Sequence, residues 1–141
     1  MIGRVFVDCN VILDLLLERK PFFDAAAELF TIIEQDGLDA CVSPLVFSNL
    51  FYILRKDLSG PGARAALRKL RTLMQVLPAN EKSLDRALAS SSTDFEDAVH
   101  YYFALEHGLD AIVTRDPSGF EGSQLPILTA EGCVELWRRQ T

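Results

Sequence analysis

The sequence predicts an α/β fold: a three-layer α/β/α sandwich with a mostly parallel sheet of four to five strands. Short apolar runs typical of buried strands alternate with longer amphipathic patterns typical of helices. Strands separated by helices pair in parallel, and right-handed crossovers then place helices on both faces of the sheet. Because the 141 residues contain no linker and no internal repeat, we expect one domain over residues 1–141.

In the first half of the chain, apolar spacing and the residues that end each run predict the element boundaries. Gly37 suits the end of a helix, because glycine is frequent just after the last helical residue. Pro44 suits the first turn of a helix, where its missing N–H costs no hydrogen bond. We therefore expect a strand over Gly3–Val7, helices over Val11–Leu17 and Pro21–Asp36, a strand over Leu38–Val42 and a helix over Pro44–Lys56.

The second half of the chain begins after a turn and ends in a helix. Residues 59–62 have the sequence Ser-Gly-Pro-Gly, a composition typical of turns. Pro78 ends a strand, and His107-Gly108 ends a helix. We expect a helix over Ala63–Leu73, a strand over Met74–Leu77, helices over Glu81–Ser90 and Asp94–Glu106, strands over Asp110–Thr114 and Leu125–Leu128, and a helix over Ala130–Arg139.

The composition is that of a globular protein with an acidic charge balance. Lys and Arg total 14 against 20 Asp and Glu, a net charge of −6. This balance argues against a protein that grips DNA through bulk positive charge, but it is compatible with a nucleic-acid enzyme whose acidic pocket binds metal ions. Without an apolar run of roughly 20 residues or an export signal, we expect a cytoplasmic protein with no membrane contact.

Carboxylates follow the predicted strands at the point where an open parallel sheet binds its ligands. Such sheets use the carboxyl ends of their strands. Asp8 follows the first strand and Asp116 follows the fourth, so both lie at the same edge. Asp94 and Asp97 are three residues apart near the start of a helix, so they share one helical face.

Most of these acids also have a purely structural explanation. Asp8 suits a helix cap, and Asp116 suits the opening of a turn. Thr93 with Glu96 fits a capping box, in which Asp94 would lie at the positive end of the helix dipole. No such explanation fits Asp97, because its helix contains no Lys or Arg to pair with it.

The acids considered together predict a metal site. Asp8, Asp97 and Asp116 come from separate elements that a parallel sheet brings to one edge, where several carboxylates repel each other unless a cation lies among them. Oxygen ligands without His or Cys select Mg²⁺ or Mn²⁺. In such pockets these ions orient water and a phosphate for in-line displacement.

Four segments, in order along nearly the whole chain, resemble the motifs of one family. They are VFVDCNVILDLL over residues 5–16, SPLVFSNLFY over residues 43–52, DFEDAVHY over residues 94–101 and IVTRDPSGF over residues 112–120. On these motifs the chain resembles the PIN domain, the ribonuclease fold of VapC-type toxins in toxin–antitoxin pairs.

The resemblance implies a function and a set of site residues. Asp8, Asp97 and Asp116 match the family's metal-binding catalytic acids, and Asn10 and Thr114 match its supporting polar residues. The implied activity is Mg²⁺- or Mn²⁺-dependent hydrolysis of RNA phosphodiester bonds, as the toxin of a type II pair. The implied partners are an RNA substrate, a cognate antitoxin protein and a second copy of the chain.

One position departs from the family pattern. Asn49 stands where many PIN domains have Glu. An amide oxygen can coordinate a hard cation, but it brings no charge. We therefore hypothesise a weaker or single-metal site, in which Asn49 is a supporting residue and Asp94 supplies the missing carboxylate.

A basic stretch offers a way to hold RNA. Arg64, Arg68 and Arg71 are spaced i, i+4 and i+7, so they share one face of a predicted helix. They are candidate contacts to the RNA backbone. A solvated amphipathic face explains the same spacing, and the sequence leaves both interpretations open.

Two other functions compete with a nuclease. A degenerate PIN domain would bind RNA or protein without cutting, and Asn49 keeps this alternative open. The segment from Asp8 to Val11 also resembles the opening of haloacid dehalogenase phosphotransferases, where the first Asp is a nucleophile. That chemistry needs a lysine near the phosphate, and no lysine of this chain follows a predicted strand.

Overall fold

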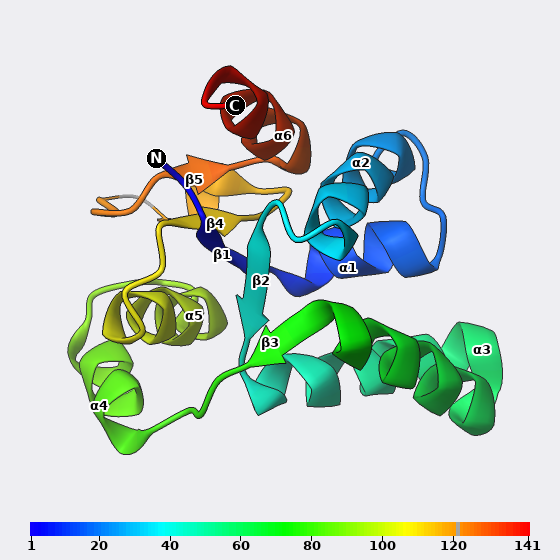
Figure 1. Cartoon of the computed structure of the whole chain (residues 1–141). Coiled ribbons are helices and arrows are strands. Elements are labelled where there is room, and N and C mark those ends of the chain that lie inside the picture. The colour runs from blue at the N-terminus through cyan, green and yellow to red at the C-terminus, as the bar shows by residue number, and fades with distance from the viewer. Residues whose placement is uncertain (121) are drawn as a thin grey trace.

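A single sheet in which all strands are parallel forms the centre of the molecule (Figure 1). The computed structural model describes residues 1–120 and 122–141. The strand order is β3-β2-β1-β4-β5, and each neighbouring pair is parallel. The strands are β1 (Arg4–Val7), β2 (Asp39–Val42), β3 (Met74–Val76), β4 (Ala111–Val113) and β5 (Ile127–Leu128). The predicted fold class is therefore confirmed, with five strands and a wholly parallel sheet.

Helices cover both faces of this sheet. They are α1 (Cys9–Leu16), α2 (Phe23–Glu34), α3 (Pro44–Leu73), α4 (Glu81–Ala89), α5 (Phe95–Glu106) and α6 (Ala130–Arg139), with a short 3₁₀ helix, η1, over Pro117–Phe120. Helices α2 and α6 lie side by side, and α4 and α5 pack together elsewhere on the sheet (Figure 1). None of the described helices is long and apolar enough to cross a membrane.

The core is built around β1, whose side chains point alternately to the two faces of the sheet. Val5, Phe6 and Val7 are all fully buried. Phe6 meets α5, where its ring centroid lies 5.9 Å from that of Phe103 and 4.9 Å from that of His100. Burial on both faces explains why β1 is continuously apolar rather than alternating.

Helix α3 consists of two arms that meet at Ser59. The backbone of Ser59 has φ of 63° and ψ of 171°, which are not helical values. We call residues 44–58 the first arm and residues 60–73 the second arm, and the chain reverses direction between them (Figure 1). The predicted break between two helices is therefore confirmed at Ser59, whereas residues 60–62 are helical rather than part of the turn.

The order of the strands fixes where a ligand would bind. From β1 the chain continues to β2 and β3 on one side, whereas β4 and β5 lie on the other side. The crevice between β1 and β4 is thus the point where the connections diverge, and open α/β sheets bind ligands at the carboxyl ends of such a pair. Asp8 and Thr114 directly follow these two strands.

Candidate active site

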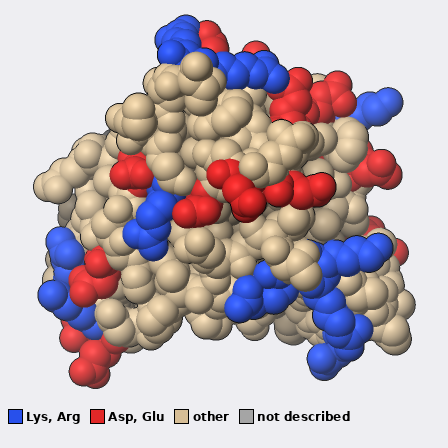
Figure 2. Space-filling view, in the orientation of Figure 1, with Lys and Arg blue, Asp and Glu red and all other residues tan. Residues whose placement is uncertain are grey.

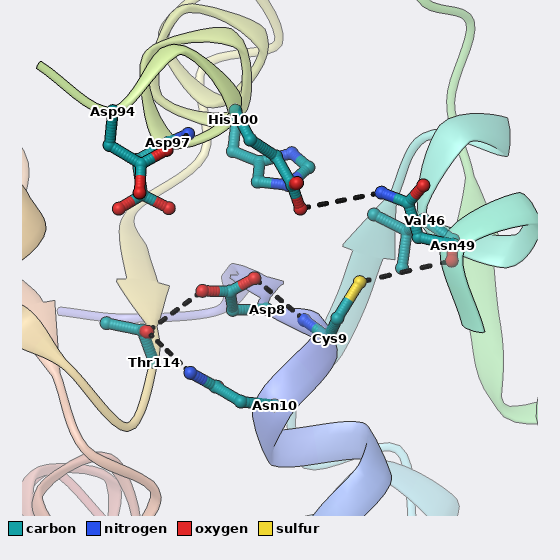
Figure 3. Close-up of polar contacts among 10 residues, drawn as sticks. Asp8, Cys9, Asn10, Val46, Asn49, Asp94, Asp97, His100 and Thr114 are labelled. Atoms are coloured by element: carbon teal, nitrogen blue, oxygen red, sulfur yellow. Dashed lines mark hydrogen bonds and ion pairs between the residues drawn. The ribbon is translucent and has the colours of Figure 1, made fainter. Parts of the chain in front are cut away.

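Asp8 is held rigidly where β1 ends and α1 begins. It is the N-cap of α1, and its Oδ1 accepts a hydrogen bond from the backbone N–H of Cys9 at 2.8 Å. Its Oδ2 accepts a hydrogen bond from Oγ1 of Thr114 at 2.9 Å. The side chain is buried. Asp8 is therefore confirmed as a helix cap, and its carboxylate is fixed at the crevice (Figure 3). Its role as a metal ligand stays a prediction.

Thr114 and Asn10 connect the β1 side of the crevice to the β4 side. The hydroxyl of Thr114 donates its hydrogen bond to Asp8. Its oxygen, Oγ1, accepts a hydrogen bond from the backbone N–H of Asp116 at 3.3 Å and lies 3.5 Å from Nδ2 of Asn10. Asn10 uses its Oδ1 to accept from the backbone N–H of Arg115 at 3.2 Å. These contacts are those of supporting residues, because they fix the carboxylate of Asp8 and the turn after β4.

Asp97 approaches Asp8 from the start of α5, together with Asp94. Asp94 is the N-cap of α5 and accepts a hydrogen bond from the backbone N–H of Asp97 at 3.0 Å. The expected capping box at Thr93 is therefore wrong, because Asp94 takes that position one residue later. Burial, together with the charges of Asp94 and Asp8, raises the pKa of Asp97 to about 6. The three carboxylates therefore interact electrostatically.

A third acid of this helix, Glu96, was missed from the sequence. Its Oε1 accepts a hydrogen bond from Nδ2 of Asn49 at 3.4 Å and lies 3.4 Å from Nε2 of His100. His100 is buried, and its hydrogen bond holds the pKa of Glu96 below the usual value. The i, i+4 spacing of Glu96 and His100 was a signal for this pair, whereas the contact with Asn49 joins elements that are distant in the sequence.

Asp116 lies at the same edge, but its carboxylate is directed into its own turn. The side chain is exposed, and its Oδ1 accepts a hydrogen bond from Oγ of Ser118 at 2.5 Å. Within residues 1–120 and 122–141, no three His, Cys, Asp or Glu side chains converge closely enough to enclose a metal ion by themselves. The structure thus places Asp8 and Asp94 near enough to Asp97 to raise its pKa, and Asp116 remains a predicted ligand.

The donor set at this edge fits a hard divalent cation. Mg²⁺ is commonly bound through one or two carboxylates with several water molecules, so a closed protein cage is not required. In the described part of the chain, no Lys or Arg forms an ion pair with Asp8, Asp94 or Asp97. A Cβ on Gly119 would lie 2.5 Å from Oδ2 of Asp97, so glycine keeps space open beside that carboxylate.

A groove of about 710 Å³ runs along α5 from Asp94 and Asp97. Asp94 and Asp97 line one part of it, and Tyr101, Tyr102 and Arg86 line another. The guanidinium carbon of Arg86 lies 4.7 Å from the ring centroid of Tyr102. The candidate site is therefore open to a large polar molecule.

The three arginines predicted to bind RNA gather on the second arm of α3. Arg64, Arg68 and Arg71 line a second groove, of about 560 Å³, between the two arms. Figure 2 shows Lys and Arg side chains concentrated over α3 in the orientation of Figure 1. The groove belongs to the helix that carries Asn49, but these arginines are not among the residues around Asp8.

Comparisons with known proteins bear on the family and the fold of the chain. The sequence model of the PIN domain family matches residues 4–118. The Ribonuclease VapC1 of Aquifex aeolicus (strain VF5) is 24% identical over 139 residues, which cover 95% of each chain.

Solved structures have a similar fold. VapBC-1 from nontypeable Haemophilus influenzae matches with a TM-score of 0.68 and 15% identity, over 90% of this chain and 98% of that chain. VapC20 of Mycobacterium tuberculosis, described as a sarcin–ricin loop cleaving toxin, matches with a TM-score of 0.63 and 16% identity, over 82% of this chain and 92% of that chain. At these identities the likeness establishes the fold.

Proposed function

The chain belongs to the PIN domain family, and from this membership and the acidic crevice we propose that it is a metal-dependent endoribonuclease. The observation that carries the proposal is the carboxylate of Asp8, which is fixed by two hydrogen bonds at the divergence of β1 and β4 and faces Asp97. The Aquifex relative bears the name of a ribonuclease. Membership of this family also removes the phosphotransferase alternative.

In the proposed mechanism the protein holds an RNA phosphodiester beside its carboxylates. Asp8, Asp97 and Asp116 would hold Mg²⁺ or Mn²⁺, which when bound lowers the pKa of a water molecule and stabilises charge on the phosphate oxygens. Thr114 and Asn10 keep Asp8 in place. Asp97 would be a ligand of the ion or would orient the attacking water.

Glu96 is a better candidate than Asp94 for the carboxylate that Asn49 does not supply. Asp94 already accepts the capping hydrogen bond of α5. Glu96 directly contacts Asn49, and its charge acts on both Asp97 and the neighbouring Cys9. We therefore assign Glu96 to the acidic site, with Asp94 as the alternative.

The proposed partners follow from the family and from the charge of α3. Arg64, Arg68 and Arg71 would contact the RNA backbone. The Haemophilus structure is that of a VapBC complex, so we propose that this chain is the toxin of a type II pair and is bound by a cognate antitoxin protein. We also propose that two copies of the chain associate.

A catalytically degenerate PIN domain is the second candidate function. Asn49 in place of Glu favours it, as does the lack of a preformed three-residue metal cage in the described part of the chain. Such a module would bind RNA or protein without hydrolysing a phosphodiester bond.

The cleavage of total cellular RNA by the purified chain tests the proposed function. With Mg²⁺ or Mn²⁺ we expect fragments from the wild type, and we expect none after addition of EDTA or in the Asp8→Asn variant. Asp85→Asn removes an exposed acid of α4 and serves as the matched control that keeps cleaving. An Asp8→Asn variant that cuts like the wild type would contradict the proposal. A wild type that binds Mn²⁺ and RNA but cuts nothing would favour the degenerate module.

A further inference from the structure

The turn after β4 is attached to α1 at two points of a single residue, Arg115. The backbone N–H of Arg115 donates a hydrogen bond to Oδ1 of Asn10 at 3.2 Å, and its Nε lies 3.5 Å from Oδ2 of Asp14. Asn10 and Asp14 are four residues apart in α1, so they lie one turn apart on the same face of that helix. This face therefore fixes both the backbone and the side chain of Arg115.

The guanidinium group of Arg115 joins three segments of the chain. Its carbon lies 4.3 Å from the ring centroid of Phe22, the residue that precedes α2, while its Nε faces Asp14 in α1. The side chain of Arg115 is 33% exposed, so most of its surface is covered by the protein. The turn after β4 is thereby anchored to α1 and to the start of α2.

Stability alone does not explain the presence of Asp14. The residue is 2% exposed, and its Oδ1 has no hydrogen-bond partner among the described residues. Burying a carboxylate costs free energy, and apolar residues of similar volume often replace a buried ion pair without loss of stability. An ion pair that leaves one buried oxygen unsatisfied is therefore better explained by the position in which it holds Arg115.

The residue that follows Arg115 is Asp116, the predicted ligand at this edge of the sheet. Its backbone N–H donates a hydrogen bond to Oγ1 of Thr114 at 3.3 Å, whereas its carboxylate is exposed and bonds only with Ser118 of its own turn. Because the peptide bond between neighbouring residues is planar and rigid, fixing Arg115 also fixes where the Cα of Asp116 lies. The exposed carboxylate is left to change rotamer from that fixed point.

We propose that Asp14 and Arg115 are positioning residues of the metal site, which hold the turn after β4 so that Asp116 can serve as a ligand together with Asp8 and Asp97. The inference rests on the proposed metal-dependent ribonuclease function. Neither residue of the pair contacts the ion or the RNA, and both act through the backbone of Asp116. Residues that orient the ligands of a metal ion generally affect both metal affinity and activity.

A direct contact between Arg115 and an RNA phosphate is the competing explanation. The structure favours positioning, because the charge of Arg115 is already paired with Asp14 and its guanidinium lies against Phe22. The two explanations differ in what a substitution changes. Loss of a phosphate contact reduces the salt dependence of RNA binding, whereas loss of positioning weakens the binding of the metal ion.

Calorimetric titration of Mn²⁺ into the full chain tests this inference without RNA. Arg115→Met and Asp14→Leu each remove the ion pair and keep apolar bulk. Arg138→Met is the matched control, because it breaks the ion pair between Arg138 and Glu28, which joins α6 to α2. Ile33→Val removes one buried methyl group of α2 and controls for a small loss of stability. All titrations are made well below the lowest melting temperature of the set.

We expect Arg115→Met and Asp14→Leu each to weaken Mn²⁺ binding about tenfold and to lower kcat for RNA cleavage, while the two controls do neither. In an Asp116→Asn background Arg115→Met should cause no further loss, because it acts through Asp116. Asp14→Asn keeps an oxygen that accepts a hydrogen bond from Nε of Arg115, so this conservative variant should retain most of the affinity.

Three results would overturn the inference. The first is an unchanged Mn²⁺ affinity in both Arg115→Met and Asp14→Leu. The second is a further loss of affinity when Arg115→Met is added to Asp116→Asn. The third is a smaller salt dependence of RNA binding when Arg115→Met is added to the Asp8→Asn chain, with Mn²⁺ binding by the Arg115→Met single variant unchanged, which would identify a phosphate contact.

The outcomes also separate this inference from the proposed function. If the wild type cleaves RNA but Arg115→Met and Asp14→Leu bind Mn²⁺ and cut as before, the positioning role fails and the nuclease remains. If both variants lose Mn²⁺ affinity as expected and the wild type cuts no RNA, the nuclease fails and the positioning role remains. A wild type that binds no Mn²⁺ would overturn the inference in either case.

Discussion

Two regions of the molecule bury acidic side chains, and they compensate the charge differently. Asp14 in α1 is buried, and its Oδ2 lies 3.5 Å from Nε of Arg115, whose guanidinium carbon lies 4.3 Å from the ring centroid of Phe22. Burial raises the pKa of Asp14, and the charge of Arg115 opposes that effect. Asp97 has only acids and His100 among the charges that act on its pKa.

The difference indicates which acids are structural. Around Asp14 the chain supplies its own cation, Arg115, which partly offsets the free-energy cost of burying a carboxylate. Around Asp8 and Asp97 the described side chains include no Lys or Arg partner, so mutual repulsion remains uncompensated. A cation from solution fits the second region, whereas in the first region Arg115 already lies beside the carboxylate.

The largest effect is expected from filling the space beside Asp97. In Gly119→Ala the new Cβ forces the carboxylate of Asp97 away, because the two would otherwise lie 2.5 Å apart. We expect RNA cleavage to fall by roughly 10- to 100-fold with an unchanged melting temperature, as when the support of a metal ligand is lost. Gly60→Ala, where no atom lies within 4 Å of the new Cβ, is the control. Equal loss in both variants would contradict the geometry.

A smaller effect is expected from the acid beside Asn49. We predict that Glu96→Gln weakens Mn²⁺ binding by about tenfold, since it removes one negative charge from the site. Adding Asn49→Glu to that variant should restore the affinity, because the charge returns to the adjacent position. Calorimetric titration measures both. If Asp94→Asn weakens binding and Glu96→Gln does not, Asp94 is the compensating acid.

The unpaired arginines of α3 extend the comparison from acids to bases. Arg115 is paired with Asp14, whereas Arg64 and Arg68 have no carboxylate partner among the described residues. Replacing both by Gln should weaken RNA binding a few-fold and reduce the slope of log affinity against log salt by roughly 1.4, about 0.7 for each lost contact with a single strand. Anisotropy at several salt concentrations measures the slope. An unchanged slope would mean that Arg64 and Arg68 face solvent and make no contact with the RNA phosphates.

The smallest effect concerns the stability contributed by Asp14. Because its pKa is raised on folding above the ordinary value of 3.8, the stability that it contributes is present below that value and is lost as the pH rises through the raised pKa. The free energy of unfolding of Asp14→Asn should therefore improve relative to the wild type as the pH increases. Urea unfolding at several pH values measures this. If the variant instead became less stable relative to the wild type as the pH increased, the charge of Arg115 would affect the pKa of Asp14 more than burial does.

Much of the fold was predictable because it follows from local patterns. The strand over Gly3–Val7 differs from β1 by one residue, and the turn at Ser59 lies where a Ser-Gly-Pro-Gly sequence was present. The ends of the elements were predicted less accurately than their order. The first helix begins at Cys9 rather than at the predicted Val11, because Asp8 caps it. Capping depends on which side chain reaches a free N–H, and this is decided by geometry that neighbouring residues set.

The candidate site was predictable in part. The topology brought Asp8 and Asp97 to one edge, as their positions after a strand and at the start of a helix indicate. The contact between Asn49 and Glu96 spans 47 residues of sequence and depends on how α3 packs near α5, so no local pattern signalled it. The direction of the Asp116 carboxylate depends on the turn that Ser118 closes, which sequence spacing does not specify.

The most direct test of the account is calorimetric titration of Mn²⁺ into the wild type, Asp97→Asn and Asp14→Asn. The account predicts that the wild type and Asp14→Asn bind the ion with similar affinity, because Asp14 already has its cation in Arg115. It predicts that Asp97→Asn loses most of this affinity. Binding that is unchanged in Asp97→Asn, or absent from the wild type, would contradict the claim that the crevice between β1 and β4 is a metal site.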